Sequence, residues 1–151
     1  MNYTETRINK LRNYLFGVIN DLAQDDRYQI NADFLGEIGD YSLDKIPVET
    51  KAGKWIIGSV RKKEVFSFRS RKAYSQDAIN NLKNIGFFEE FAEKIEYNND
   101  HGVLPDINGI ESIECLNPGT LNDVSGTQAI FDIQIQIIYR DNKEEQVSLW
   151  K

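Results

Sequence analysis

The clearest pattern along the chain is a strict alternation of apolar and polar positions near its C-terminal end. The apolar positions are Phe131, Ile133, Ile135, Ile137 and Tyr139, and the positions between them hold Asp132, Gln134, Gln136 and Ile138. Successive side chains of a strand point to opposite faces of a sheet, so this pattern predicts a long strand with one buried face. Its other face is polar and nearly uncharged. Gln134 and Gln136 there are either ordinary solvent-exposed residues or contacts with another protein.

Two stretches repeat their apolar residues with helical spacing. Between Ile8 and Leu22 the apolar residues recur at steps of three and four, which predicts an amphipathic helix from about Thr4, with Thr4 or Thr6 as N-cap. Farther along, a helix is expected to begin near Ser75 and to stop at Asn84-Ile85-Gly86, because glycine often ends helices.

A second helix is expected directly after that glycine. Phe88, Phe91 and Ile95 form its inner stripe, which we assign to the core. Its outer, solvated face holds Glu89, Glu90, Glu93, Lys94 and Glu96. The middle of the chain therefore predicts a pair of consecutive helices.

Further segments have strand character. Alternation predicts a strand from Tyr28 to Phe34, and a shorter strand is expected from Ser112 to Leu116. The segment from Gly39 to Trp55 contains Pro47 and two glycines, which favours an extended edge segment over a central strand. The next segment, from Lys54 to Ser70, is expected to form a hairpin with its turn around Gly58-Ser59.

In that hairpin Glu64, Phe66, Phe68 and Ser70 share one face, and the two phenylalanines should point into the core. Together the elements predict an α+β fold: a mostly antiparallel sheet with an N-terminal helix and a central helix pair packed on one face. A chain of 151 residues with 40% apolar and 28% charged residues fits one folded domain, from residue 1 to 151.

Candidate chemistry is sparse. His101 is the only histidine, and the sequence contains no phosphate-binding loop, dinucleotide fingerprint, zinc-protease motif or nucleophile elbow. Asp100, His101 and Asp106 provide too few close ligands for a closed metal site, and the lone Cys115, which excludes an internal disulfide, lies in a predicted strand. We therefore expect no catalytic residue, metal or cofactor, and keep a small enzyme only as a distant alternative. The apolar runs of the sequence are too short to span a membrane, and we expect no secretory signal because the N-terminal residues lack an apolar segment.

The formal charge of −6 argues against a protein that wraps nucleic acid. One basic cluster interrupts the acidic chain and consists of Arg61, Lys62, Lys63, Arg69, Arg71 and Lys72. It is either a solvated hairpin rim or a contact surface for an acidic partner chain or for passing DNA.

Three segments carry a resemblance to a known family. They are Tyr41-Ser42-Leu43 with Ile46-Pro47, the strand end Phe66-Ser67-Phe68-Arg69-Ser70-Arg71, and Asn84-Ile85-Gly86-Phe87-Phe88-Glu89 with Phe91. From about Asp40 to Tyr139 the chain resembles a family of prophage proteins of low-GC Gram-positive bacteria, described as minor capsid or tail terminator proteins. Members also occur in phage-tail-like bacteriocin particles.

The resemblance implies a structural protein that caps the head-proximal end of a tail tube as a hexameric ring, ends tail polymerisation and joins the tail to the neck. Its partners would be further copies of itself, the tail tube protein, a sheath where one is present, and a neck or connector protein, with DNA at most passing through the lumen. Its place would be a virion or phage-tail-like particle assembled in the bacterial cytoplasm. The basic cluster could then face Glu89, Glu90 and Glu93 of a neighbouring copy, with Gln134 and Gln136 as uncharged contacts. A head-tail connector or another neck component is the alternative.

Overall fold

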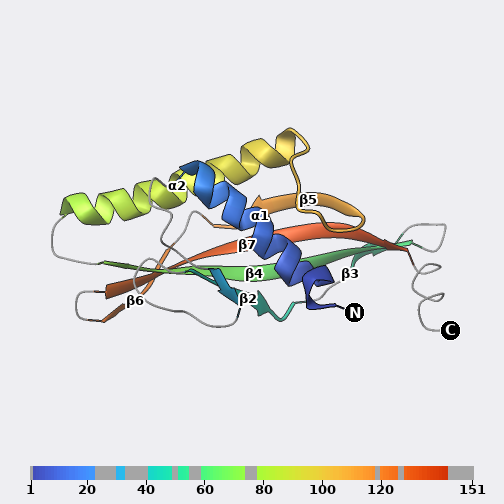
Figure 1. Cartoon of the computed structure of the whole chain (residues 1–151), viewed down its shortest axis with the longest axis horizontal. Coiled ribbons are helices and arrows are strands. Elements are labelled where there is room, and N and C mark those ends of the chain that lie inside the picture. The colour runs from blue at the N-terminus through green and yellow to red at the C-terminus, as the bar shows by residue number, and fades with distance from the viewer. Residues whose placement is uncertain are drawn as a thin grey trace.

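One sheet with two α-helices on one of its faces forms the described part of the protein (Figure 1). The computed structural model describes residues 2–22, 30–32, 41–48, 51–54, 59–73, 78–117, 120–125 and 128–142. The helices are the short 3₁₀ helix η1 (Tyr3–Glu5), α1 (Arg7–Leu22) and α2 (Ala78–Asp100). The strands are β1 (Ile30–Ala32), β2 (Tyr41–Ile46), β3 (Lys51–Lys54), β4 (Ser59–Ala73), β5 (Ile110–Cys115), β6 (Thr120–Ser125) and β7 (Gln128–Asn142).

Two long strands form the centre of the sheet. β4 and β7 each have 15 residues and pair antiparallel over their whole length, from Ser59 opposite Asn142 to Ala73 opposite Gln128. Shorter strands flank this ribbon: β2 and β3 pair with β4, while β5 and β6 pair with β7. Among the described strands, the pairing of β1 with β2 is the one parallel pairing. The prediction of an α+β fold with a mostly antiparallel sheet is thereby confirmed.

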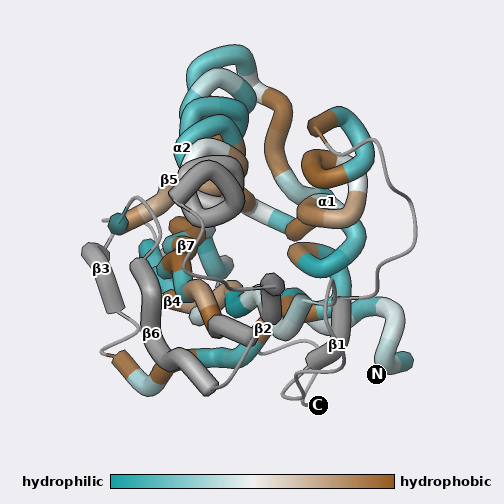
Figure 2. Tube along the Cα trace, turned by 90° about the vertical axis from the view of Figure 1, so that its left-hand side faces the viewer, coloured by the Kyte–Doolittle hydropathy of each residue, from teal (hydrophilic) through white to brown (hydrophobic). Residues whose placement is uncertain are grey.

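The core lies between the helices and one face of the sheet. Its fully buried residues include Leu11, Leu15 and Ile19 from α1, Phe91 and Ile95 from α2, and Leu43, Phe68, Ile113, Ile133, Ile135 and Ile137 from the sheet. Figure 2 shows the outer side of α2 as hydrophilic, while hydrophobic positions of α1 and of the sheet lie toward the space between the layers. The core roles predicted for the phenylalanines of β4 and for the inner stripe of α2 are therefore confirmed.

Aromatic rings connect the sheet to α2. Phe68 stacks on Tyr41 on one side and on Phe91 on the other, with ring centroids 5.2 Å apart in both pairs. A second stack joins Phe88 to Phe131, with centroids 5.4 Å apart. Offset stacking of this kind adds about 0.5–1.5 kcal/mol per pair beyond the burial of area. The two stacks fix α2 over the centre of the sheet.

α1 begins directly after Thr6, one of the two predicted N-caps. Its N-cap is Thr6, whose hydroxyl accepts a hydrogen bond from the backbone N–H of Asn9 at 3.4 Å. The preceding turn, η1, is capped in the same way by Asn2, whose side chain accepts from the N–H of Thr4. Side-chain oxygens thus satisfy backbone donors that the first turn of a helix leaves without a partner.

The predicted helix pair is wrong, because α2 is one continuous helix of 23 residues that includes Gly86. Positive backbone φ angles occur among the described glycines only at Gly102 and Gly109, so Gly86 does not adopt the left-handed geometry that ends a helix. Glycine inside a helix costs about 1 kcal/mol relative to alanine, which the packing of α2 on the sheet offsets. Ser75, the predicted N-cap, lies outside the described residues.

The segment around Tyr41 is an internal strand rather than the predicted edge. β2 pairs with β4 on one side and with β1 on the other, and Tyr41, Ser42 and Leu43 are buried. Pro47 follows the last residue of β2 and therefore removes no hydrogen bond from the sheet. The later part of the same predicted segment is an edge as expected, because β3 pairs only with β4 in the described part.

The hairpin prediction is confirmed by the pairing of Lys54 in β3 with Val60 in β4. The expected turn at Gly58 lies outside the described residues, and Ser59 already belongs to β4. For the predicted strand from Tyr28 to Phe34, the described part is β1. β6 was not predicted from the sequence, and it pairs with the N-terminal part of β7.

Candidate subunit interface

The two faces of the sheet differ in what covers them. In β4, Phe66 and Phe68 point toward the helices, and strand alternation places their odd-numbered neighbours on the opposite side, termed here the open face. Directly opposite pairs share a face, so β7 adds its even-numbered residues to it. On the open face lie Arg61, Lys63, Val65, Ser67 and Arg69 of β4, and Asp132, Gln134, Gln136, Ile138 and Arg140 of β7. This surface contains several of the interface candidates predicted from the sequence.

The basic cluster is not one patch. Because β4 is extended, Arg61 and Arg69 are separated by about 26 Å at the usual rise per residue of a strand. Lys62 points to the helix side, whereas Lys63 points to the open face. Arg71 and Lys72 are placed by their backbone in β4, and their side chains lie outside the described part. The basic side chains are therefore distributed between the two ends of β4 and between the two faces of the sheet.

Three of these cations already form ion pairs within the chain. Distances between nitrogen and oxygen are 2.9 Å for Arg61–Glu111, 2.8 Å for Lys62–Asp141 and 2.5 Å for Arg69–Asp44. Pairs with partly exposed side chains stabilise a fold by only about 0–1 kcal/mol. They nevertheless neutralise charge locally, so these three residues attract an acidic partner less than their bare charge suggests.

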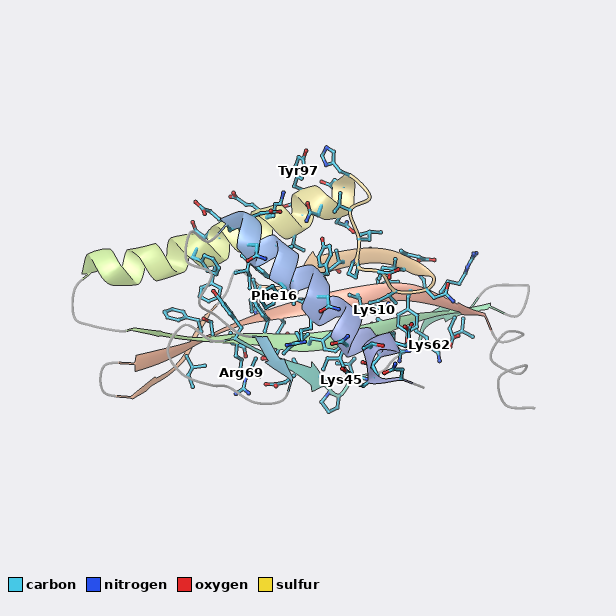
Figure 3. All side chains as sticks on the ribbon, in the orientation of Figure 1. Lys10, Phe16, Lys45, Lys62, Arg69 and Tyr97 are labelled. Carbon is cyan, nitrogen blue, oxygen red and sulfur yellow. The ribbon has the colours of Figure 1, made fainter. Side chains whose placement is uncertain are left out.

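Arg69 belongs to a polar network on the open face. Asp44 accepts hydrogen bonds from the Ser42 hydroxyl at 2.8 Å and from the Arg69 guanidinium, and the Ser67 hydroxyl donates to Asp132 at 2.7 Å. The Nε atom of Arg69 is buried and has no hydrogen-bond partner in the described structure. Figure 3 shows Arg69 on the side of the sheet away from the helices, and Tyr97 projecting from the helix layer on the other side.

The outer side of α2 is strongly acidic, as predicted. Glu89, Glu90, Glu93 and Glu96 are exposed, and no ion pair is found for them among the described residues. Near the end of α2 the Lys94 ammonium lies 5.4 Å from the ring centre of Tyr97, which itself stacks on His101. The carboxylates of α2 thus form a continuous surface on the face of the molecule opposite to the open face of the sheet.

Gln134 and Gln136 are half-buried in the middle of β7. The Gln136 amide donates a hydrogen bond to Glu114 at 2.7 Å, and the backbone N–H of Gln134 donates to the side chain of Asn117 at 3.0 Å. Charged residues flank them on the same face: Glu114 and Asp132, and the diagonal neighbours Lys63 and Arg69 on β4. A role for the two glutamines in subunit contact stays a prediction.

Glu64 is a buried carboxylate with two ion-pair partners, which the sequence did not predict. Its side chain is only 3% exposed, and it pairs with Arg7 at the start of α1 and with Lys45 in β2, the latter at 2.7 Å. Burial alone would raise the pKa of Glu64, but the hydrogen bonds from Lys45 and Arg7 lower it below its ordinary value. The available signal was its position on the same strand face as Phe66 and Phe68.

The guanidinium of Arg7 also lies 4.8 Å from the ring centre of Tyr139. Burial and the negative charge of Glu64 raise the pKa of Tyr139 to about 12, so its hydroxyl stays protonated at neutral pH. This cluster joins α1, β2, β4 and β7 at one end of the core. Because each charge has a partner and no reactive group is activated, we assign the cluster a structural role.

The remaining candidate chemical groups are structural in their surroundings. Burial, with a smaller effect of Glu114, raises the pKa of Cys115 to about 12, which disfavours the reactive thiolate. His101 is exposed after the end of α2, and its Nδ1 lies 2.8 Å from the backbone oxygen of Tyr97. Among the described residues, no group of three His, Cys, Asp or Glu side chains is arranged to hold a metal ion.

Comparison of the chain with models of known protein families and with curated proteins gave no match. In the described part of the chain, neither α-helix combines the length and the apolar character needed to cross a membrane.

Proposed function

We propose that the protein is a structural subunit of a phage or phage-tail-like particle, which caps the head-proximal end of the tail tube as a ring. Support comes from the resemblance of the segments around Tyr41, Phe66 and Phe91. All three segments meet in one stack of rings, because Tyr41, Phe68 and Phe91 pack in succession. The most distinctive residues of the resemblance therefore belong to the core, as expected for a shared fold rather than a shared active site.

The observation that carries the proposal is the β4–β7 ribbon with its polar open face. No described helix lies on that face (Figure 1), and the described residues contain no group of three His, Cys, Asp or Glu side chains that could hold a metal ion. Ser42, Val65 and Ser67 are buried on this face, whereas Gln134, Gln136 and Ile138 are partly exposed. A largely polar, partly exposed sheet face suits side-by-side association of subunits better than it suits turnover of a small molecule. The proposed partners are further copies in a hexameric ring, the tail tube protein with a sheath where one is present, and a neck or connector protein.

A head-tail connector is the alternative, and the balance of secondary structure favours the terminator. Connectors are often mainly helical, whereas the described part of this chain has seven strands in one sheet and two α-helices. A ring at the tube end would end polymerisation by covering the surface to which the next tube subunit adds. DNA would at most pass through the lumen.

Electron microscopy of assembled particles tests the proposal. With an electron-dense label on the protein, we expect one ring at the head-proximal end of each tube, and tails of irregular length when the gene is deleted. Label distributed along the tube or over the capsid shell would refute the assignment.

A further inference from the structure

Several charged side chains of the described residues take part in no ion pair, and two groups of them lie on opposite faces of the molecule. Ion pairs within the chain use Arg7, Lys10, Lys45, Arg61, Lys62 and Arg69. Among the described residues no ion pair is found for Lys63 and Arg140, both on the open face, or for the four glutamates of α2. Lys63 and Arg140 thus lie on the other side of the domain from the glutamates of α2. The open face also carries Asp132 and Glu114, for which no ion pair is found among the described residues either.

The positive charges form a compact group, termed here the basic corner and consisting of Arg61, Lys63 and Arg140. Arg61 lies directly opposite Arg140 across the β4–β7 pairing, and Lys63 is the diagonal neighbour of Arg140 on the same face. Like charges directly opposite each other destabilise a sheet. One carboxylate, Glu111, is described in contact with the group, at 2.9 Å from Arg61. The basic corner keeps an excess of positive charge that an outside anion would relieve.

Arg140 is the member that sequence reasoning missed. It is far from Arg61 and Lys63 in the sequence, and only the register of β7 against β4 brings the three together. Its side chain is exposed, and its backbone is fixed because its N–H donates a hydrogen bond to the carbonyl of Gly109 at 2.8 Å. This hydrogen bond fixes the backbone from which the exposed guanidinium extends, while ordering of the side chain itself on binding still costs conformational entropy.

We propose that the basic corner binds the acidic outer face of α2 on a second copy of this chain, an inference that rests on the proposed ring. The α2 face carries Glu89, Glu90, Glu93 and Glu96, and on that face Lys94 is the described cation. The two surfaces are complementary in charge, and each would repel its own kind. Contact between them is therefore heterologous, with different patches of neighbouring copies meeting head to tail.

Opposite faces of one subunit are well placed for such a contact. A head-to-tail interface leaves one free patch of each kind on every growing chain of subunits, and a fixed rotation per subunit closes it into a ring. A contact built from exposed charges forms rapidly and weakens as salt screens it. Assembly through these surfaces should therefore depend strongly on ionic strength.

A charge-swap experiment tests the contact with purified full-length protein. One variant reverses the basic corner (Lys63→Glu with Arg140→Glu), and a second reverses the helix face (Glu90→Lys with Glu93→Lys). Sedimentation at about 0.05 M and ~0.5 M salt measures self-association. We expect the wild type to associate at low salt, and each variant alone to associate at least about tenfold more weakly. An equimolar mixture of the two variants should recover association, because each then offers the surface that the other lacks.

Asp21→Lys on α1 is the control, since Asp21 is exposed and lies outside both surfaces. It changes the net charge in the same direction as the helix-face variant and should leave association unchanged. A wild type that stays monomeric at low salt overturns the inference, as does association that survives either reversal or a mixture that fails to recover. These outcomes are separate from the microscopy test, because a ring at the tube end formed by both reversed variants would refute this contact and keep the proposed function.

Discussion

Replacement of Gly109 by alanine should destabilise the protein through a collision that the backbone makes unavoidable. Gly109 has a φ angle of +78°, and a Cβ atom added there would lie 2.2 Å from the carbonyl oxygen of Arg140. The same residue pair is joined by the hydrogen bond from the Arg140 N–H to the Gly109 carbonyl. The methyl group therefore strains its own backbone and also pushes apart the contact between the start of β5 and the end of β7.

The magnitude follows from these two effects. A non-glycine residue in the left-handed region costs about 1–2 kcal/mol. Displacement of Arg140 weakens a backbone hydrogen bond worth about 0.5–1.5 kcal/mol, and the remaining overlap adds strain. We expect Gly109→Ala to lower the free energy of unfolding by about 2–4 kcal/mol, a large fraction of the ~5–15 kcal/mol typical of a domain. Urea unfolding followed by circular dichroism measures it.

Gly102 is the matched control, because its φ angle is +72° but an added Cβ would meet nothing within 4 Å. Gly102→Ala should cost only the backbone strain, about 1 kcal/mol. The difference between the two variants isolates the collision with Arg140. Equal costs for Gly102→Ala and Gly109→Ala would refute the close approach of β5 to β7 as the origin of the effect.

Four further predictions follow from the helices and the buried charges. Gly86→Ala should stabilise the protein by about 1 kcal/mol in urea unfolding, because Gly86 lies inside α2 with open space around an added Cβ; a loss of stability would contradict the continuous helix. Phe91→Ala should cost about 3–5 kcal/mol in the same assay, since Phe91 is fully buried on Phe68; a normally stable variant that merely lost a binding partner would show that the ring is a docking residue. Glu64→Gln should cost about 1–3 kcal/mol at pH 7, because its partners Arg7 and Lys45 are 45% and 51% exposed and remain hydrated. The pKa of Glu64 is lowered in the folded state, so the stability difference from wild type should be complete above about pH 5 and shrink as the pH falls through that pKa. A stability difference that does not change with pH would argue against the ion cluster. His101→Ala should leave particle assembly and tail length unchanged in electron micrographs, because the imidazole is exposed; loss of a measurable turnover in this variant would instead reveal an enzyme.

Elements with a strong period of their own were predictable from the sequence. The alternation from Phe131 to Tyr139 is reproduced residue by residue in the burial of β7, and the stripe of Phe88, Phe91 and Ile95 is buried as expected. In both cases the spacing of apolar residues within one short segment predicts which side chains are buried, and no knowledge of residues distant in the sequence is needed.

Elements that depend on distant partners were not predictable. β6 has the sequence Thr-Leu-Asn-Asp-Val-Ser, whose polar residues show no alternation, and it becomes a strand because β7 extends far enough to pair with it. β2 was assigned to an edge because of the nearby Pro47 and glycines, and the alternation that predicts a strand around β1 does not reveal that this strand pairs in parallel with β2. Gly86 was misread for the opposite reason, since a strong local preference was overridden by the packing of α2.

The candidate interface divides in the same way. Exposure of the α2 glutamates follows from helical period alone, whereas the basic corner needs the register of β4 against β7. Lys62 and Arg69 looked equivalent to Lys63 in the sequence, and only the structure reveals their partners Asp141 and Asp44. Which charged side chains lack an ion-pair partner can therefore be known only from the folded structure.

The place of β7 in the sheet has a consequence for how the protein is made. β7 follows every other described strand in the sequence, yet it pairs with β4, β5 and β6. During synthesis on the ribosome, β1 to β6 emerge before β7, the strand with which β4, β5 and β6 all pair. The apolar faces of these strands stay uncovered until β7 is made. A chain released before Gln128 would leave the described strands in three unconnected parts, namely the strands paired around β4, β5 alone and β6 alone, so completion of the sheet must wait until β7 has been translated.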